Sequence, residues 1–547
     1  MVTLFAYSNE ETSLSARALS RFLQFSVTFI FNNMIATTIL IATGTTVAYV
    51  FLRAYFSVRK YRQVLGKIGV PEVPDKGWKG GWSQYTDTND LFQLERDMVK
   101  KYGKVFGLYE GQYPVLVVTE LSMLKQIMLK DHEHFYDRRV VFKTRKSVFD
   151  FSLILLTGAR WKHTRQLITP AFTPANLRRM EPLLKKVCST MVANIDETVD
   201  QNVSFDAKEI TSFFAMDAVA TIAFALDLDS KQNQDSEFVK NARLMFTVFP
   251  FNGKFMTLLL MFPDFMTSLL RKIPLKAIVG DIGKVLVETV TNELDRRKAV
   301  GNEQRQDFLN LLIPLEKDPD SEENKEFIKY DEMGSRWLTN GFSRPEIIGQ
   351  SIMFFLAGYE TTSSALAMAL YAMALNPTIQ EKLYQDLKNH LTDKEMSLET
   401  LNEVPYLAMC INEMLRCYSP TLRIDRVCTS DTVVNGFHIP KGVTINIPVN
   451  AIHHDPEHWP NPDVFDPERF RDMDSIPPMA FIPFGAGNRN CIGMRLAMLE
   501  IKMALATLML RFKFSMAPEA KIPIRFQPTA IRIPHSETPL KMIAIRR

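Results

Sequence analysis

A single cysteine lies in a glycine-rich segment directly before a long predicted helix. The segment 484–493 reads Phe-Gly-Ala-Gly-Asn-Arg-Asn-Cys-Ile-Gly, which places the thiol at Cys491, and residues 494–511 contain neither Gly nor Pro. Such a Leu-, Ala- and Met-rich stretch is typical of a helix. Backbone N–H groups and the positive end of the dipole at a helix N-terminus lower the pKa of a thiol and favour the thiolate. The pattern therefore predicts an anionic sulfur that binds iron.

Two other interpretations of this segment were weighed against the iron ligand. A lone cysteine is most often a buried and inert side chain. The second interpretation is a dinucleotide-binding fingerprint, whose first two glycines would be Gly485 and Gly487, but its third position falls on Asn490. The preceding residues 479–484 are also short and interrupted by proline, which makes them a poor central strand. The fingerprint is therefore excluded, whereas these residues alone leave the inert cysteine open.

A second polar group interrupts a long apolar segment. Residues 343–346, Ser-Arg-Pro-Glu, form a capping box with proline in the first turn. They predict a helix that ends at Leu375, before an Asn-Pro pair, with a length of about 48 Å. In its middle, Gly358 weakens the helix, and the hydroxyl of Thr361 can bond a carbonyl of the preceding turn and bend it. Both effects predict a groove that can admit a ligand, or an ordinary polar notch in a core helix.

Two further pairs of side chains lie one helical turn apart. Glu413 and Arg416 share one face of a predicted helix with apolar neighbours. A buried ion pair of this kind needs additional partners, because breaking it costs about 3–5 kcal/mol. Trp161 and Arg165 likewise place an indole N–H and a guanidinium on one face, which suits buried carboxylates. On these residues alone, the second pair is equally compatible with a routine amphipathic helix.

Composition limits the class of protein. The chain has 547 residues, 46% of them hydrophobic, and a net charge of +4, which is too small to indicate nucleic-acid binding. Five cysteines without CxxC spacing argue against a disulfide framework and against a zinc site. The histidines at 453, 454 and 458 lie among prolines and acids in a predicted surface loop, where we expect no metal.

The N-terminal part is predicted to be a membrane anchor. Residues 34–52 form an apolar run of about 19 residues, long enough to span about 30 Å as a helix. We assign residues 1–33 to an N-terminal extension and residues 53–82 to a basic, Pro- and Gly-containing hinge. The basic residues after the run place the following domain, residues 83–547, on the cytoplasmic side. That domain is predicted to be mainly α with a small β region, including a hairpin of 105–109 with 113–118.

The pattern Phe-x-x-Gly-x-Arg-x-Cys-x-Gly resembles the haem-binding loop of the cytochrome P-450 family, the haem-thiolate monooxygenases. Every fixed position of that loop is filled, and three further motifs follow in the order typical of the family. The resemblance covers about residues 70–547 and implies the cytochrome P-450 fold. The Ala-Gly-Tyr-Glu-Thr-Thr segment and the Arg-Val-Cys run near residue 427 are most similar to the microsomal branch that oxidises drugs and steroids.

The resemblance also implies a role for each candidate residue. Cys491 would be the axial thiolate to the iron of haem b. Other cofactor-binding residues, mainly for the haem propionates, would be Trp161, Arg165, Arg426, Phe484 and Arg489, with either Arg138 or Arg139 in addition. Glu360 and Thr361 would form an acid–alcohol pair that delivers protons for O–O cleavage. Glu413 and Arg416 would be joined by Arg469 in a structural network. Candidate residues for the substrate pocket are Leu356, Ala357, Thr421 and Leu422.

The implied activity is the insertion of one oxygen atom from O2 into a lipophilic small molecule. Electrons would come from NADPH through a flavoprotein reductase, with cytochrome b5 as a further candidate partner. The implied location is the endoplasmic reticulum membrane, with a single-pass anchor. The Phe-rich residues 244–270 would form the roof of the pocket and dip into the lipid. Lys162, Arg495 and Lys502 form either a docking surface for an acidic electron donor or a solvated face.

Two rival functions are considered, one within the enzyme class and one from another class. A haem-thiolate isomerase or dehydratase that acts on peroxides needs no external electrons and can dispense with an acid–alcohol pair. A catalytically silent haem-binding or sensor protein would not turn over with a reductase. The intact Glu360 and Thr361 favour the monooxygenase over the first rival.

Overall fold

The computed structural model describes residues 63–74, 88, 90–111, 113–140, 147–248, 266, 283–301, 307–331, 334–526 and 536–547, with eight isolated positions between 37 and 52. The chain divides into two units, Met1–Lys60 and Tyr61–Arg547. Most of the predicted anchor at 34–52 and of the predicted roof at 244–270 lies outside the described residues. Within the described part of the chain, no helix is both long and apolar enough to cross a membrane.

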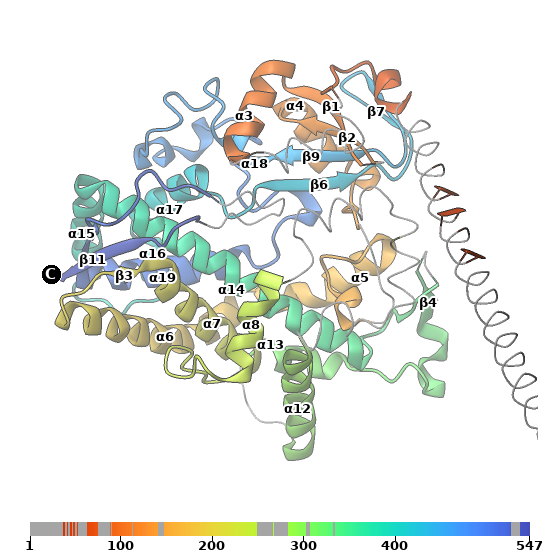
Figure 1. The fold of residues 1–547 in the computed structure, drawn as a ribbon. Helices are drawn as coiled ribbons and strands as arrows, with labels where there is room; N and C mark the ends of the chain where they lie inside the picture. Colours follow the sequence, from red (N-terminus) through yellow and green to blue (C-terminus); the bar gives the residue numbers. More distant parts are fainter. Residues whose placement is uncertain are drawn as a thin grey trace, which may run out of the picture. The chain divides into compact units, whose positions relative to one another are not determined.

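The second unit is mainly helical, as predicted (Figure 1). Its longer helices are α3 (Leu91–Tyr102), α5 (Gly158–Ile168), α6 (Pro174–Asp200), α7 (Ala207–Phe224), α8 (Glu237–Val248), α12 (Lys284–Val300), α14 (Arg344–Leu375), α15 (Pro377–Leu391), α17 (Pro405–Cys417) and α19 (Met494–Arg511). The five-residue helices are α4 (Leu121–Lys125), α13 (Phe308–Leu312), α16 (Leu398–Asn402) and α18 (Val449–His453). Short 3-10 and π turns connect several of them.

The β region consists of small sheets. The largest has the strand order β1-β2-β9-β6 and contains β1 (Val105–Glu110), β2 (Tyr113–Val118), β6 (Arg423–Val427) and β9 (Thr444–Pro448). The predicted hairpin is confirmed, since β1 and β2 pair antiparallel with Val105 opposite Val118. A three-stranded sheet joins β10 (Phe512–Met516), β11 (Lys541–Arg546) and β3 (Phe205–Asp206). Two-stranded pairs are β4 (Ile328–Tyr330) with β5 (Arg336–Leu338), and β7 (Thr432–Val434) with β8 (Phe437–Ile439).

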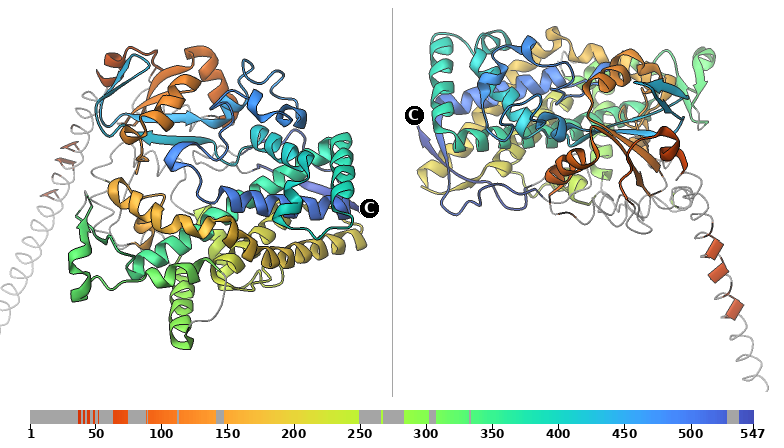
Figure 2. Two further views of the ribbon diagram at one scale, coloured as in Figure 1. Left: turned by 180° about the vertical axis from the view of Figure 1, so that it is seen from behind. Right: turned by 90° about the horizontal axis from the view of Figure 1, so that it is seen from above.

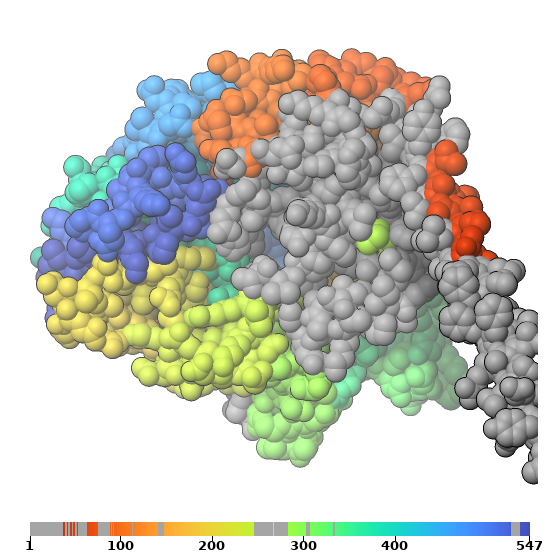
Figure 3. Space-filling model, viewed as in Figure 1, coloured from red at the N-terminus to blue at the C-terminus, as the bar shows by residue number. Residues whose placement is uncertain are grey.

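The C-terminal strand closes the fold against α6. Figure 3 shows these two segments side by side on one face, and they pack together. Arg546 of β11 forms ion pairs with Asp196 at 2.5 Å and with Asp200 at 2.6 Å. Because these groups are partly exposed, solvent screens the pairs, and they add little to the stability of the fold.

Helix α14 is the centre of this unit (Figure 2). It spans 32 residues between the capping box of Ser343 with Glu346 and the Asn-Pro pair, which confirms the predicted bounds. Most of its side chains are buried all round, as expected for a helix that crosses a core. It packs against α7, α12, α17, α19 and β10. A second carboxylate oxygen of Glu346 binds the buried Arg160 of α5 at 2.7 Å, which ties α5 to the start of α14.

Close backbone packing fixes where α14 lies. A Cβ atom on Gly349 would approach the carbonyl oxygen of Val148 to 2.2 Å, so only glycine fits there. Val148 belongs to the 3-10 turn Val148–Phe151, which precedes α5. Further along, a Cβ atom on Gly358 would approach Val219 Cγ2 of α7 to 2.5 Å. The glycines therefore permit contacts that a larger residue would push apart.

We predict that Gly349→Ala lowers the stability of the fold, although alanine is the better helix former by about 1 kcal/mol. The clash with the backbone should cost about 1–3 kcal/mol, measured as the shift of the urea unfolding midpoint. Gly66→Ala is the matched control, because a Cβ atom there would meet only Glu72 Oε1 at 3.7 Å within the described residues. Equal stability of the two variants would contradict the tight contact.

Candidate active site

The Cys491 segment forms a tight loop between the sheet region and α19. The backbone N–H of Cys491 donates to the carbonyl of Phe484 at 2.8 Å, and Gly485 and Gly487 have φ angles of 70° and 69°. A Cβ atom on Gly487 would lie 2.0 Å from the carbonyl oxygen of Met128, in the π turn Gln126–Lys130. The Phe484 ring is half-buried and packs against the main core. The glycines thus let the loop press against another backbone and present Cys491.

The electrostatic environment of Cys491 differs from the sequence prediction. Its side chain keeps accessible surface, yet protein surrounds the sulfur, and this burial raises the pKa of the thiol. The backbone of Gly493 and the guanidinium groups of Arg138 and Arg165 act in the opposite direction. The prediction of a lowered pKa is therefore wrong for the protein alone, because burial is the larger effect. A bound metal ion removes the proton from a coordinating thiol outright.

Two of the predicted haem-binding arginines hold the loop itself. Arg165 of α5 donates to the carbonyl oxygen and to Oδ1 of Asn490, both at 2.9 Å. The buried Arg489 donates to the carbonyl oxygen of Tyr136 at 2.6 Å and of Leu156 at 2.7 Å. Its guanidinium also lies 3.9 Å from the ring centre of Trp161. Trp161, Arg165 and Arg489 are thus brought together beside Cys491.

The structure separates the roles of Arg138 and Arg139. Arg139 Nη2 pairs with Glu110 Oε2 at 2.5 Å, and its backbone N–H donates to Asp425 at 2.7 Å. Arg138 instead donates to the carbonyl oxygen of Arg489 at 3.3 Å, and its charge opposes the rise in the pKa of Cys491. Arg138 is therefore the member of the pair on the side of the sulfur.

Several positively charged side chains gather around this loop. Burial lowers the pKa of Arg489 to about 9, and the repulsion from Arg138 and Arg426 adds to the effect, while Asp137 at 3.4 Å opposes it. Arg426 of β6 is itself buried and donates to the carbonyl oxygen of Asp425 at 2.8 Å. Buried cations of this kind need anionic partners. The donor set, one thiol beneath a group of guanidiniums, fits a haem with two propionates.

Three consecutive residues of α14 bind in different directions. The buried Glu360 accepts from Lys208 of α7 at 2.7 Å, and burial lowers the pKa of Lys208. Thr361 is half-buried and donates to the carbonyl oxygen of Ala357 at 2.6 Å, as predicted for a hydroxyl one turn on. Thr362 donates to Glu500 of α19 at 2.9 Å. Sequence reasoning missed Lys208, since it lies 152 residues from its partner.

The proposed pocket residues fall into two groups. On α14, Ala357 is exposed and Leu356 half-buried, although the helix around them is buried. Ala357 and Thr361 therefore form an accessible stripe on one helix face. Leu422 is buried in the apolar cluster of the sheet region, and the backbone of Thr421 donates to Ser419 at 3.3 Å. Of the predicted basic surface, Lys162 and Arg495 are exposed, while Lys502 binds Asn402 at 2.7 Å.

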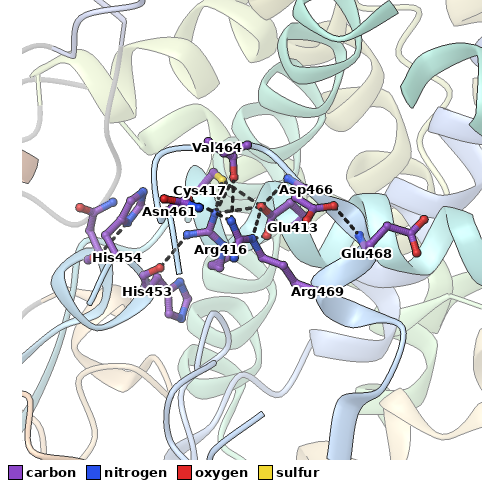
Figure 4. Close-up of polar contacts among 11 residues, drawn as sticks. Glu413, Arg416, Cys417, His453, His454, Asn461, Val464, Asp466, Glu468 and Arg469 are labelled. Carbon is purple, nitrogen blue, oxygen red and sulfur yellow. Dashed lines mark hydrogen bonds and ion pairs between the residues drawn. The ribbon is translucent and has the colours of Figure 1, made fainter. Parts of the chain in front are cut away.

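The structural network is assembled from three segments (Figure 4). Glu413 and Arg416 are fully buried and joined by two hydrogen bonds of 2.7 and 2.8 Å. Arg469 Nε lies 3.4 Å from Glu413 Oε1. A further contact to Glu413 Oε1 comes from the backbone N–H of Asp466 at 2.8 Å. The network therefore fixes the segment at 464–470 against α17.

His453 extends this network toward the cysteine loop. Its carbonyl oxygen accepts from Arg416 at 2.8 Å, and its Nε2 accepts from the backbone N–H of Ile482 at 2.9 Å. The side chain is completely buried, so the predicted surface loop is wrong at this position. Burial lowers the pKa of His453 to about 3, which keeps the ring neutral and able to accept. Spacing in the sequence carries no signal for this contact, because it joins residues of different segments.

A mainly helical fold, with the Cys491 loop beside the buried guanidinium groups of Arg426 and Arg489, fits a haem-thiolate protein. Residues 71–542 match the family model for Cytochrome P450, and the chain belongs to this family. The resemblance stated from the motifs is confirmed.

Similar proteins include cytochrome P450 3A14 of Cavia porcellus, with 33% identity over 87% of this chain and 92% of that protein. Cytochrome P450 3A6 of Oryctolagus cuniculus is 32% identical over the same shares of the two chains. Cytochrome P450 3A13 of Mus musculus is 31% identical over 94% of this chain and 97% of that protein. Together with the family, these relatives make the protein a P450 monooxygenase, an oxidoreductase that incorporates molecular oxygen.

We predict that Glu413→Gln destabilises the protein by about 3–5 kcal/mol, because it leaves Arg416 and Arg469 without their buried counter-charge. The measurement is the urea unfolding midpoint together with the fraction of purified protein that retains haem. Glu399→Gln is the control, since Glu399 pairs with Arg178 on the surface with both side chains more than half exposed. A loss no larger than in the control would show that the network does not hold this region.

Proposed function

We propose that this monooxygenase inserts one oxygen atom from O2 into a lipophilic small molecule, with Cys491 as the axial thiolate to haem b. The observation that carries the proposal is the Cys491 loop, which Arg165 holds through Asn490 and Arg489 holds through Tyr136. Haem supplies the binding and reductive activation of dioxygen, and a thiolate ligand favours O–O cleavage. The similarity to P450 3A proteins supports the microsomal drug- and steroid-oxidising branch.

The residues around the loop would hold the haem in place. Arg165, Arg426 and Arg489, with the indole of Trp161, would bind its propionates, and Arg138 joins them because it faces the sulfur. Charge-assisted hydrogen bonds of this type are about twice as strong as neutral ones. Two negative charges would also relieve the repulsion that lowers the pKa of Arg489. The Phe484 ring would line the same side of the loop.

Two α14 residues, Glu360 and Thr361, would deliver the protons that O–O cleavage needs. Thr361 has a hydroxyl that already binds the Ala357 carbonyl, so it can orient a water molecule there. Glu360 would supply protons from the interior as a general acid. Its ion pair with Lys208 holds the carboxyl group in place, and the hydroxyl of Ser364, 3.2 Å away, offers a path for proton exchange. Leu356, Ala357, Thr421 and Leu422 would face the substrate.

Electrons would come from NADPH through a flavoprotein reductase, with cytochrome b5 as a further donor. The exposed Lys162 and Arg495 support a basic docking surface for an acidic partner. Residues 34–52 would anchor the protein in the endoplasmic reticulum membrane, after an extension of residues 1–33. Residues 53–82 would connect that anchor to the catalytic domain, residues 83–547, in the cytoplasm. A membrane-bound enzyme would take lipophilic substrates from the bilayer.

We predict that Thr361→Ala retains haem but separates NADPH consumption from product formation. Without the hydroxyl, proton delivery falters, and the product formed per NADPH should fall about tenfold or more while hydrogen peroxide release rises. The assay uses full-length protein, a flavoprotein reductase and a panel of lipophilic steroids, with Thr361→Ser as the control that keeps a hydroxyl.

Two outcomes would contradict this account of the activity. A normal product yield per NADPH in Thr361→Ala would remove Thr361 from proton delivery. Turnover of organic hydroperoxides without NADPH, and none with NADPH and reductase, would indicate an isomerase or dehydratase instead.

A further inference from the structure

Glu500 is a buried carboxyl group that joins the two helices on either side of the site. It lies on α19, nine residues after Cys491 (from position 491 to 500), and only 1% of its surface is exposed. Its Oε2 accepts from Thr362 of α14 at 2.9 Å, and among the described residues its Oε1 is buried without a hydrogen-bond partner. No part of the activity proposed above uses this group.

The surroundings of Glu500 contain no counter-charge among the described residues. Burial raises the pKa of Glu500 to about 8, and the Thr362 hydroxyl is the only group that opposes the shift. Cys188 of α6 lies close enough for the charge of Glu500 to affect its pKa. Burial raises the pKa of that thiol to about 12, so it stays neutral. An unpaired carboxylate in such a site is costly, and the group stays protonated at neutral pH instead.

The contact controls the orientation of α14 at the candidate proton-delivery residues. Successive helical residues point about 100° apart, because 3.6 residues make one turn. Glu360 is held by Lys208 of α7, and Thr362 is held by Glu500 of α19. Thr361 lies between these two fixed side chains, on the stripe that stays accessible. A rotation of the helix at this point would have to break one of the two contacts.

We propose that Glu500 is a positioning residue of the monooxygenase site, which holds α14 through Thr362 and thereby sets the direction of the Thr361 hydroxyl. This inference rests on the proposed role of Thr361. Through Thr362, Glu500 also connects α14 to α19, the helix that begins directly after the Cys491 loop. The two functional segments, far apart in the sequence, are thus linked by one hydrogen bond between neutral groups.

The protonation of Glu500 makes the stability of the fold depend on pH. A carboxyl whose pKa is raised in the folded state stabilises the fold relative to its ionised form below its ordinary value near 4.5, and that stability is lost as the pH rises toward about 8. In this window one proton is released on unfolding, so the folding equilibrium constant falls about tenfold per pH unit. Above about pH 8 the ionised group would still accept from Thr362, so ionisation changes the stability of the fold and keeps this contact.

The first test compares wild type and Glu500→Gln as full-length, haem-loaded proteins in detergent. Urea unfolding between pH 6 and pH 9 should show the tenfold loss per unit up to about pH 8 in wild type, relative to Glu500→Gln, which cannot ionise. The same pH dependence in both proteins would overturn the proposal.

The second test uses the partner residue and stays informative if Glu500→Gln fails to fold. Thr362→Val removes the hydroxyl with little change in shape, and it should raise peroxide release several-fold at pH 7, whereas Thr362→Ser should not. Normal coupling in Thr362→Val would overturn the proposal. If Thr361→Ala is itself fully coupled, the proposed function fails; if Thr361→Ala is uncoupled but Thr362→Val is coupled normally, this inference alone fails.

Discussion

An ionised sulfur in a protein interior needs positive charge nearby, because burial alone favours the neutral thiol. Around Cys491, burial raises the thiol pKa, and Arg138 and Arg165 oppose the shift. Burial lowers the pKa of the neighbouring Arg489, and repulsion from Arg138 and Arg426 adds to the effect. A thiolate-bound haem with two propionates would bring anions among these cations.

This charge arrangement explains why so much rigid structure surrounds one short loop. Gly487 lets the loop press against the backbone of Met128, Arg165 holds the carbonyl of Asn490, and the side chain of Arg489 ties the loop to the carbonyl of Leu156. On the other side, the Glu413–Arg416 network reaches the residues before the loop through His453. Groups with buried charges must be held close to their partners, because each unpaired charge would cost several kcal/mol.

The parts of the fold that depend on neighbouring residues could be predicted from the sequence. The capping box and the Asn-Pro pair indicated the bounds of α14, and two short β segments on either side of a turn at Gly111 indicated the hairpin of β1 and β2. The Glu413–Arg416 ion pair could also be predicted, because one helical turn separates its members. The hydrogen bond from the Thr361 hydroxyl to a carbonyl of the preceding turn follows from the same local geometry.

The contacts between distant segments could not be predicted in this way. Lys208 and Glu500 approach α14 from helices that are far away in the sequence, and neither lies in a recognisable pattern. The choice between Arg138 and Arg139 depends on which of two adjacent side chains meets Glu110 across the sheet. The pKa of Cys491 was misjudged because helix-end effects are local, whereas burial depends on the whole packed structure.

The most direct test of the account is the absorption spectrum of the reduced, carbon-monoxide-bound protein, recorded for wild type, Cys491→Ser and Cys428→Ser. Cys428 is a suitable control, because its buried thiol donates to the carbonyl oxygens of Ser430 at 3.0 Å and Ile439 at 3.5 Å, contacts that a serine hydroxyl can also make. The account predicts a thiolate-type Soret band in wild type and in Cys428→Ser, and its loss in Cys491→Ser. A histidine-type band in wild type, or an unchanged band in Cys491→Ser, would contradict it.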